Sequence, residues 1–157
     1  MMIIRAYEDR DLAAVADLFT TAIHVLALGH YDSPQRRAWA PQPPDLTEWR
    51  QRLGGGLQVL VAEQQGRMAG FIGFEADGHV DLLFTSPQFP RTGVATALYL
   101  QAEAQLRATG VSVMFTEASL VARPFFERQG FAIEQEQQVF RRGVCLRRYA
   151  MRKTLGC

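Results

Sequence analysis

The stretch Val80-Asp-Leu-Leu-Phe-Thr-Ser-Pro-Gln-Phe-Pro-Arg-Thr-Gly-Val-Ala-Thr96 joins a predicted strand to a predicted long helix. Apolar residues dominate positions 80–85, as expected of a buried strand. From about residue 92 to residue 108 the apolar residues recur at helical spacing, and Gly110 ends that helix. A central strand followed by a long helix is the unit around which the rest of the chain is predicted to fold.

The loop inside this stretch has the features of a phosphate site. Pro90 stiffens the entry to the helix, and the small Gly93 lets backbone approach a ligand closely. The first turn of a helix carries free N–H groups and a positive dipole end, which suit a phosphate anion. Arg91 adds a fixed charge, and Thr92 adds a hydroxyl. A plain helix start with Thr92 as its cap is the alternative interpretation.

Outward from this loop, periodicity and turn residues predict a strand-rich centre between helices. Asp77-Gly78 is a strong hairpin signal, and Asp9 or Asp11 can cap the first helix. The sequence therefore predicts one α/β domain over residues 1–157, with the mixed sheet of an α+β sandwich. The strands are expected at 3–7, 58–63, 68–75, 80–85, 111–116, 131–140 and 145–152, and the helices at 12–26, 34–40, 46–53, 92–108 and 120–129.

Charge balance and the Cys and His residues limit the classes of partner and cofactor to be expected. The 17 Lys and Arg residues nearly cancel the 16 Asp and Glu residues, which gives no reason to expect nucleic acid or an anionic membrane as partner. Cys145 and Cys157 are expected to be reduced thiols of a cytoplasmic protein, without a signal peptide or a membrane span. The three histidines, His24, His30 and His79, lack the spacing of metal ligands, so no metal is expected.

Two further motifs complete the pattern begun by residues 80–96. The chain opens with Ile4, Arg5 and Asp11, and Ser119-Leu-Val-Ala-Arg-Pro-Phe-Phe-Glu-Arg-Gln-Gly-Phe131 follows downstream. In this order and spacing, the three resemble the GNAT superfamily of acetyl-CoA-dependent N-acetyltransferases. Gly29-His-Tyr-Asp-Ser-Pro34 with Ala38-Trp-Ala40 further resembles the YafP-type branch of small bacterial members. The resemblance implies the GNAT-like acyl-CoA N-acyltransferase fold, a central mixed sheet flanked by helices.

The resemblance also implies how acetyl-CoA would bind as co-substrate. Backbone of Leu83, Phe84 and Thr85 would pair with the pantetheine arm, as in strand addition. The Leu83 N–H would donate to the thioester oxygen, and strand 111–116 would splay away to leave a slot. The pyrophosphate would lie on Arg91, Thr92, Gly93, Val94, Ala95 and Thr96, with further cofactor contacts from Ser119, Phe125, Phe126 and Arg128.

Three residues depart from the family pattern. Pro90 stands where a Gln or Arg is usual, and it lacks the N–H that could bind phosphate. Ser119 replaces a common Asn. Phe126 replaces a Tyr that protonates the departing thiolate, and Phe cannot do that. These departures weaken the catalytic inference more than the binding inference.

Acetyl transfer to an alkyl amine requires a proton acceptor, since such an amine is mostly protonated at neutral pH. Strict strand alternation would put His79, Asp81, Leu83 and Thr85 on one face, with Val80, Leu82 and Phe84 against a helix. The resemblance implies that the face with His79 looks into the acetyl-transfer cleft, where His79 stands at the position of a Glu that is often the base. His79 and the neighbouring Asp81 are the predicted bases, with Glu75 and Glu117 as weaker candidates. An exposed hairpin position for His79, and a structural partner of an Arg for Asp81, are the alternatives.

The acceptor is predicted to be a primary amine of a small molecule, attacked directly. His30, Tyr31 and Trp39 form an aromatic segment that could contact it, and Tyr31 is the tyrosine nominated as proton donor. A small satellite core under a loop is the alternative for these three residues. Two other functions stay open, a non-catalytic acetyl-CoA sensor or scaffold and a protein lysine or N-terminal acetyltransferase. A homodimer also stays open.

Overall fold

A computed structural model describes residues 1–156 and contains one seven-stranded mixed sheet of order β1-β2-β3-β4-β5-β7-β6. Every neighbouring pair of strands is antiparallel except β4 and β5, which are parallel. The strands are β1 Met2–Ala6, β2 Gln58–Gln64, β3 Arg67–Phe74, β4 His79–Thr85, β5 Val113–Ser119, β6 Ala132–Arg141 and β7 Val144–Thr154. The helices are α1 Leu12–Leu26, α2 Ser33–Trp39, α3 Leu46–Leu53, α4 Val94–Ala108 and α5 Arg123–Arg128, with a 3-10 turn at Asp9–Asp11.

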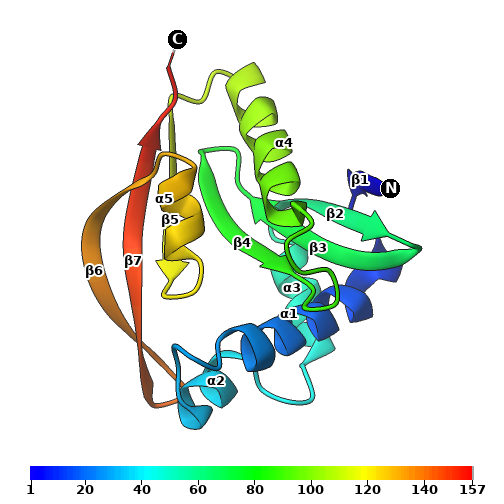
Figure 1. Cartoon of the computed structure of the whole chain (residues 1–157), viewed down its shortest axis with the longest axis vertical. Helices are drawn as coiled ribbons and strands as arrows, with labels where there is room; N and C mark the ends of the chain where they lie inside the picture. The colour runs from blue at the N-terminus through cyan, green and yellow to red at the C-terminus, as the bar shows by residue number, and fades with distance from the viewer. Residues whose placement is uncertain (157) are drawn as a thin grey trace.

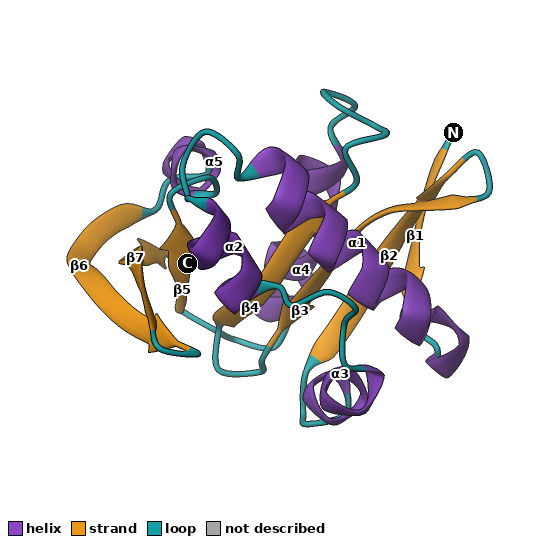
Figure 2. Cartoon of the chain, turned by 90° about the horizontal axis from the view of Figure 1, so that it is seen from below, coloured by secondary structure: helices purple, strands orange, loops and turns teal. Residues whose placement is uncertain are grey.

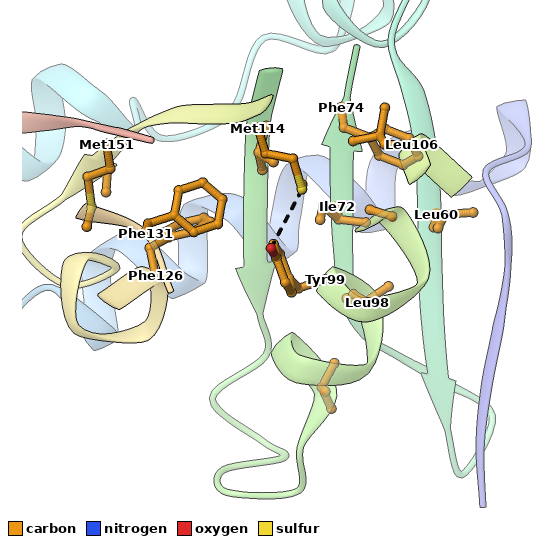
Figure 3. Packing of buried hydrophobic residues seen from close by; sticks show 14 of the residues in the cluster. Leu60, Ile72, Phe74, Leu98, Tyr99, Leu106, Met114, Phe126, Phe131 and Met151 are labelled. Atoms are coloured by element: carbon orange, nitrogen blue, oxygen red, sulfur yellow. Dashed lines mark hydrogen bonds between the residues drawn. The ribbon is translucent and has the colours of Figure 1, made fainter. Parts of the chain in front are cut away.

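Helices cover both faces of the sheet (Figures 1 and 2). On one face, α4 and α5 bury a cluster that includes Leu98, Tyr99 and Met114 (Figure 3). On the other face, α1 and α3 pack Phe19 and Trp49 against the strands. Apolar residues at three- and four-residue spacing on α1 and α4 supply these contacts, so hydrophobic burial on both sides holds the sheet in place.

The opening motif of Ile4, Arg5 and Asp11 contains an ion pair that stabilises the fold. Both Nη atoms of Arg5 donate to the Asp11 carboxylate at 2.8 Å, and Arg5 also pairs with Glu63 on β2. The Arg5 guanidinium holds the pKa of the Asp11 carboxyl below its usual value. Bidentate Arg–carboxylate pairs have defined geometry. The motif therefore ties β1 to β2 and to the start of α1.

Most predicted element bounds agree with the structure to within a few residues, and three differ for physical reasons. Helix α4 begins at Val94 and not at residue 92, because Arg91 and Gly93 have positive φ of 57° and 78°. Strand β5 runs through Ser119, three residues beyond the prediction, because its pairing with β7 continues to Ser119↔Arg148. Helix α5 spans only Arg123–Arg128, with Pro124 in its first turn, where proline is tolerated.

Candidate active site

The sheet forks where β4 and β5 part. The two strands are bridged only at His79↔Phe115 and Val80↔Thr116, after which β4 continues to pair with β3 alone. Figure 1 shows β4 and β5 diverging beyond this point. We call this divergence the fork. It confirms the predicted splaying of the fifth strand, and it leaves one backbone edge of residues 82–85 without a neighbouring strand.

The hydrogen-bond pattern shows which backbone groups face the fork. Ser86 N–H donates to the Ala69 carbonyl at 2.8 Å, beside the pair Gly70↔Thr85. In an antiparallel ladder, hydrogen-bonded pairs alternate with non-hydrogen-bonded pairs. The N–H and C=O groups of Leu83 and Thr85 therefore point into the fork, whereas those of Phe84 point to β3. The prediction that Phe84 backbone faces a pantetheine arm is wrong for this reason.

An apolar groove follows the free edge of β4 and has a volume of about 150 Å³. Leu83, Phe84 and Thr85 line it from β4, and the rest of its lining comes from α1, α2, α4 and the segment from Ser119 to Phe125. Its lining comprises Ala22, Ile23, Leu26, Ala27, Trp39, Leu83, Phe84, Thr85, Ala95, Ser119, Val121, Ala122 and Phe125. Because this surface is almost entirely apolar, it suits a flexible chain with few charges.

The loop before α4 presents backbone and charge at the surface. Phe89 is buried and anchors the loop, and Thr92 Oγ1 donates to the Phe89 carbonyl at 3.0 Å. Gly93 is the N-cap of α4, and a Cβ there would meet no protein atom within 4 Å. Arg91 and Thr96 are exposed nearby. The first-turn amides of α4 and the Arg91 guanidinium are thus available to an anion.

A polar cavity of about 160 Å³ adjoins the apolar groove and shares Trp39, Leu83, Phe84, Ser119 and Ala122 with it. Residues from four strands, β4 to β7, and from the helices α1, α2, α3 and α5 surround it. The remaining lining residues are Phe19, Tyr31, Arg52, Val80, Asp81, Leu82, Thr116, Glu117, Ala118, Phe126, Val139, Arg141, Leu146, Arg147 and Arg148. Two carboxylates, Asp81 and Glu117, lie next to the last bridge of β4 and β5, so charge is concentrated where the strands part.

A β-bulge at Asp81 changes the face assignment that strict alternation predicted. Phe74 pairs with Val80, whereas the next residue of β3, Gly73, pairs with Leu82, so Asp81 is the extra residue. As a result Val80 packs in the core under α4, and Leu82 packs in the core under α1. The prediction of one shared face for Val80, Leu82 and Phe84 is therefore wrong. Asp81 contacts α3, where Arg52 Nη2 lies 3.4 Å from its Oδ2.

His79 is clamped between two carboxylates. Its Nδ1 lies 2.6 Å from Glu75 Oε1, its Nε2 lies 2.7 Å from Glu117 Oε1, and its ring stacks on Phe115. The Glu117 hydrogen bond, with that of Glu75, raises the pKa of His79 to about 9, while His79 lowers the pKa of Glu117. A histidine with this pKa is protonated at neutral pH and is not a free base there. Sequence reasoning ranked His79 above Glu117, but only Glu117 lines the polar cavity.

Tyr31 is buried, and both hydrogen-bonding roles of its hydroxyl are used. The hydroxyl donates to the Arg147 carbonyl at 2.9 Å and accepts from the Leu120 N–H at 2.9 Å. Burial raises the pKa of the phenol above its usual value. Tyr31 lines the polar cavity, but these bonds make it a connection between the α1–α2 segment, β7 and the end of β5. The geometry gives it a structural role.

The other predicted site residues lie in different places. Trp39 lines both cavities and packs edge-on against Tyr31 at 5.3 Å between ring centroids. Phe126 is buried in the α5 core and reaches the polar cavity. Ser119 Oγ accepts from the Ala122 N–H at 3.1 Å and lies where the cavities meet. His30 and Arg128 are exposed and line neither cavity, so the structure does not bring them to the site.

Sequence reasoning missed the arginines of the polar cavity. Arg52 comes from α3, Arg141 from the end of β6, and Arg147 and Arg148 from β7. No local sequence pattern indicates that the β6–β7 hairpin, which carries three of them, returns to the fork. Among residues 1–156, no group of three His, Cys, Asp or Glu side chains could hold a metal ion. Cys145 forms no disulfide within that range, and Cys157 lies outside the described residues.

Comparison with known proteins places this site in a family. The family model of the acetyltransferase (GNAT) domain matches residues 27–155. The chain belongs to the GNAT acetyltransferase family. It is 34% identical to the N-acetyltransferase YafP of Escherichia coli K12 over 152 residues, which covers 95% of this chain and 93% of YafP. The family and the YafP-type resemblance are confirmed, and the chain is an N-acetyltransferase.

Solved structures confirm the predicted fold class. A GCN5-related N-acetyltransferase from Rhodopseudomonas palustris matches with a TM-score of 0.92 and 30% identity, over 98% of this chain and 95% of that one. The PaiA N-acetyltransferase of Thermoplasma acidophilum, solved with coenzyme A, matches with a TM-score of 0.78 and 17% identity, over 99% of both chains. The forked mixed sheet is therefore the GNAT fold. No helix among the described residues is long and apolar enough to cross a membrane.

Proposed function

We propose that this protein transfers the acetyl group of acetyl-CoA to a primary amine of a small molecule, by direct attack of the amine on the thioester. The observation that carries the proposal is the meeting of two cavities at one point of the fork. The apolar groove and the polar cavity share Leu83 and Ser119. A donor in the groove and an acceptor in the cavity would therefore meet beside the free backbone of Leu83.

Three features of the chain fit acetyl-CoA as the donor. The outward N–H and C=O groups of Leu83 and Thr85 can pair with the amides of a pantetheine arm, as in strand addition. The apolar groove covers the arm. The first-turn amides of α4, with Arg91, can hold a pyrophosphate. Solved relatives of the same fold include PaiA with coenzyme A and yncA of Salmonella typhimurium with acetyl-CoA.

The Leu83 N–H has the role of polarising the thioester. It points into the fork at the junction of both cavities, so it would donate to the thioester oxygen as negative charge develops there. A backbone donor needs no reorganisation during the reaction. The small volume of the polar cavity supports a small acceptor over a folded protein surface.

Glu117 is the residue we assign to the acceptor's proton. Glu75, protonated His79 and Glu117 carry a net charge of −1 together, whereas Asp81 is already balanced by Arg52. A positively charged amine is therefore drawn toward Glu117. The ammonium first loses one proton to solvent, and the neutral amine then attacks the thioester carbonyl. The amine N–H becomes more acidic as the new N–C bond forms, so the Glu117 carboxylate can accept this second proton. The C–S bond then breaks, and CoA leaves as a thiolate that takes a proton from solvent. Glu75 is 43% exposed and connects this cluster to solvent.

The test is CoA thiol release with a panel of primary amines. Glu117→Gln should lower kcat by about 100-fold, the lower range for loss of a general base. Its affinity for CoA, measured by calorimetry, should stay close to that of the wild type. Asp81→Asn should mainly raise KM for the amine, because it removes a charge without removing the proton acceptor. Glu134→Gln, on the exposed face of β6, is the matched control.

Full kcat in Glu117→Gln would contradict the assignment of the proton. Absence of CoA binding by the wild type would contradict the proposed donor site. Thiol release only with peptides, and with none of the small amines, would contradict the proposed class of acceptor.

A further inference from the structure

The polar cavity has two guanidinium groups that no carboxylate balances. Arg141 and Arg148 line the cavity, and neither has a carboxylate oxygen within 4.0 Å anywhere in residues 1–156. The other charges of the lining are paired, because Arg52 pairs with Asp81 and Arg147 pairs with Glu136 on β6. Glu117 pairs with His79. Both guanidinium groups carry a positive charge.

Arg148 is held in place by a neutral partner. On β7 it pairs with Ser119 of β5 and, on β6, with Gln137, whose Oε1 accepts from Arg148 Nε at 2.9 Å. That bond uses one of five N–H donors and leaves the terminal nitrogens for another ligand. Arg148 is also close enough to Glu117 to lower the pKa of that carboxyl. The guanidinium is thus oriented within the cavity and only partly hydrated.

The charges are arranged in order along the cavity. The fork carries the negative cluster of Glu75, His79 and Glu117. Residue 148 is a diagonal neighbour of Glu117 in the β5–β7 ladder, at about 7–8 Å between Cα atoms. Arg141 lies further out, near the turn between β6 and β7. One end of the polar cavity is therefore negative, and the other end is positive.

We infer that the acceptor is a zwitterion, a small amine that also carries a carboxylate or another anionic group bound by Arg148 and, for longer acceptors, by Arg141. This inference rests on the proposed function, since it names the class of acceptor for the same site. The ammonium end would lie toward Glu117 and the anionic end toward the hairpin. Guanidinium groups bind carboxylates in bidentate geometry, which would also direct the amine toward the fork.

The experiment uses pairs of amines that differ only by the anionic group. Glycine is compared with methylamine, β-alanine with ethylamine, and 4-aminobutyrate with propylamine, in thiol-release assays with saturating acetyl-CoA. Each kcat/KM is calculated from the concentration of unprotonated amine, which removes the difference in the unprotonated fraction within a pair. At least one amino acid should exceed its matched amine by about 10-fold or more, the range of a charge-assisted contact.

The variants separate recognition of the anion from catalysis. Arg148→Gln should bring the ratio within the best pair close to one, because it removes the group that binds the anionic end of the amino acid. An effect of Arg148 on Glu117 acts on both members of a pair and cancels in the ratio. Arg148→Lys should restore part of the ratio, because it keeps the charge and loses the bidentate geometry. Arg152→Gln is the matched control, because Arg152 lies four residues further along β7 and pairs with Glu134. Calorimetric CoA binding reports whether each variant is folded.

Two results would overturn the inference while leaving the proposed function intact. One is a higher kcat/KM for the amine without the anionic group in all three pairs. The other is an equal loss for both members of a pair in Arg148→Gln. If none of the amines in the panel supports thiol release and the wild type does not bind CoA, the proposed function itself is contradicted.

Discussion

Replacing His79 by Gln should change how the free energy of unfolding depends on pH. The pKa of His79 rises from 6.5 to about 9 in the folded protein, first because of the Glu117 hydrogen bond. At about 1.4 kcal/mol for each factor of ten in proton affinity, this rise corresponds to at most about 3 kcal/mol. Glu75 is 43% exposed, and solvent weakens its part of the interaction, so about 1–3 kcal/mol is expected.

The sign follows from the direction of the pKa change. Protonated His79 favours the folded state, so its contribution is complete below the unfolded pKa of 6.5. The contribution decreases as pH rises and is lost above about 9. The lowered pKa of Glu117 reports the same interaction and is not counted again. His79→Gln should therefore destabilise the protein by about 1–3 kcal/mol at pH 6 and by much less at pH 9.5.

Urea unfolding of both proteins at pH 6, 7.5 and 9.5 measures this difference. His30→Gln is the control, because His30 is exposed and lines neither cavity. Other groups that titrate over this range are common to wild type and variant, so their contributions cancel in the difference. A difference in unfolding free energy that is equal at pH 6 and pH 9.5 would refute the reasoning and leave His79 as an ordinary packed residue.

Two further substitutions test the loop and the tyrosine. Gly93→Val forces a β-branched residue to a φ of 78° and should strongly reduce CoA affinity measured by calorimetry. Gly29→Val is the control, because Gly29 has open space around it and no positive φ. Equal CoA affinities of the two variants would contradict a pyrophosphate site in this loop. Tyr31→Phe loses two hydrogen bonds and should lower the unfolding free energy by about 1–3 kcal/mol with kcat changed only a few-fold. A large fall in kcat at unchanged stability would make Tyr31 a proton donor.

Local patterns predicted the elements of the fold well, because most of its signals lie within short windows. The apolar spacing of α4 and the Asp77-Gly78 hairpin depend on neighbouring residues alone. The β-bulge at Asp81 has no such signal, since it exists only relative to the register of β3. One extra residue in β4 reverses the facing of the residues before it. The predicted faces of β4 therefore failed although the strand itself was correctly placed.

The charges of the candidate site depend on contacts between distant parts of the chain. The pKa of His79 is set by Glu117, 38 residues away, which reaches it through the single parallel pairing in the described sheet. Arg148 reaches the cavity because the β6–β7 hairpin pairs with β5. Sequence alone could list these titratable residues, but it could not rank them. Their ranking follows from which side chains the long-range register brings together.

The same long-range contacts explain why the fork stays open. A free strand edge in a sheet normally attracts another strand. Here the Tyr31 hydroxyl bonds the end of β5 through the Leu120 N–H and β7 through the Arg147 carbonyl. The Trp39 ring packs against Tyr31 and also against Phe84 of β4, at 6.3 Å between the Trp39 and Phe84 ring centroids. These contacts hold the end of β5 against β7 and hold Trp39 beside β4. Since the contacts are all internal to the chain, the edge of Leu83 and Thr85 is held ready for a ligand, and little ordering cost remains to be met on binding.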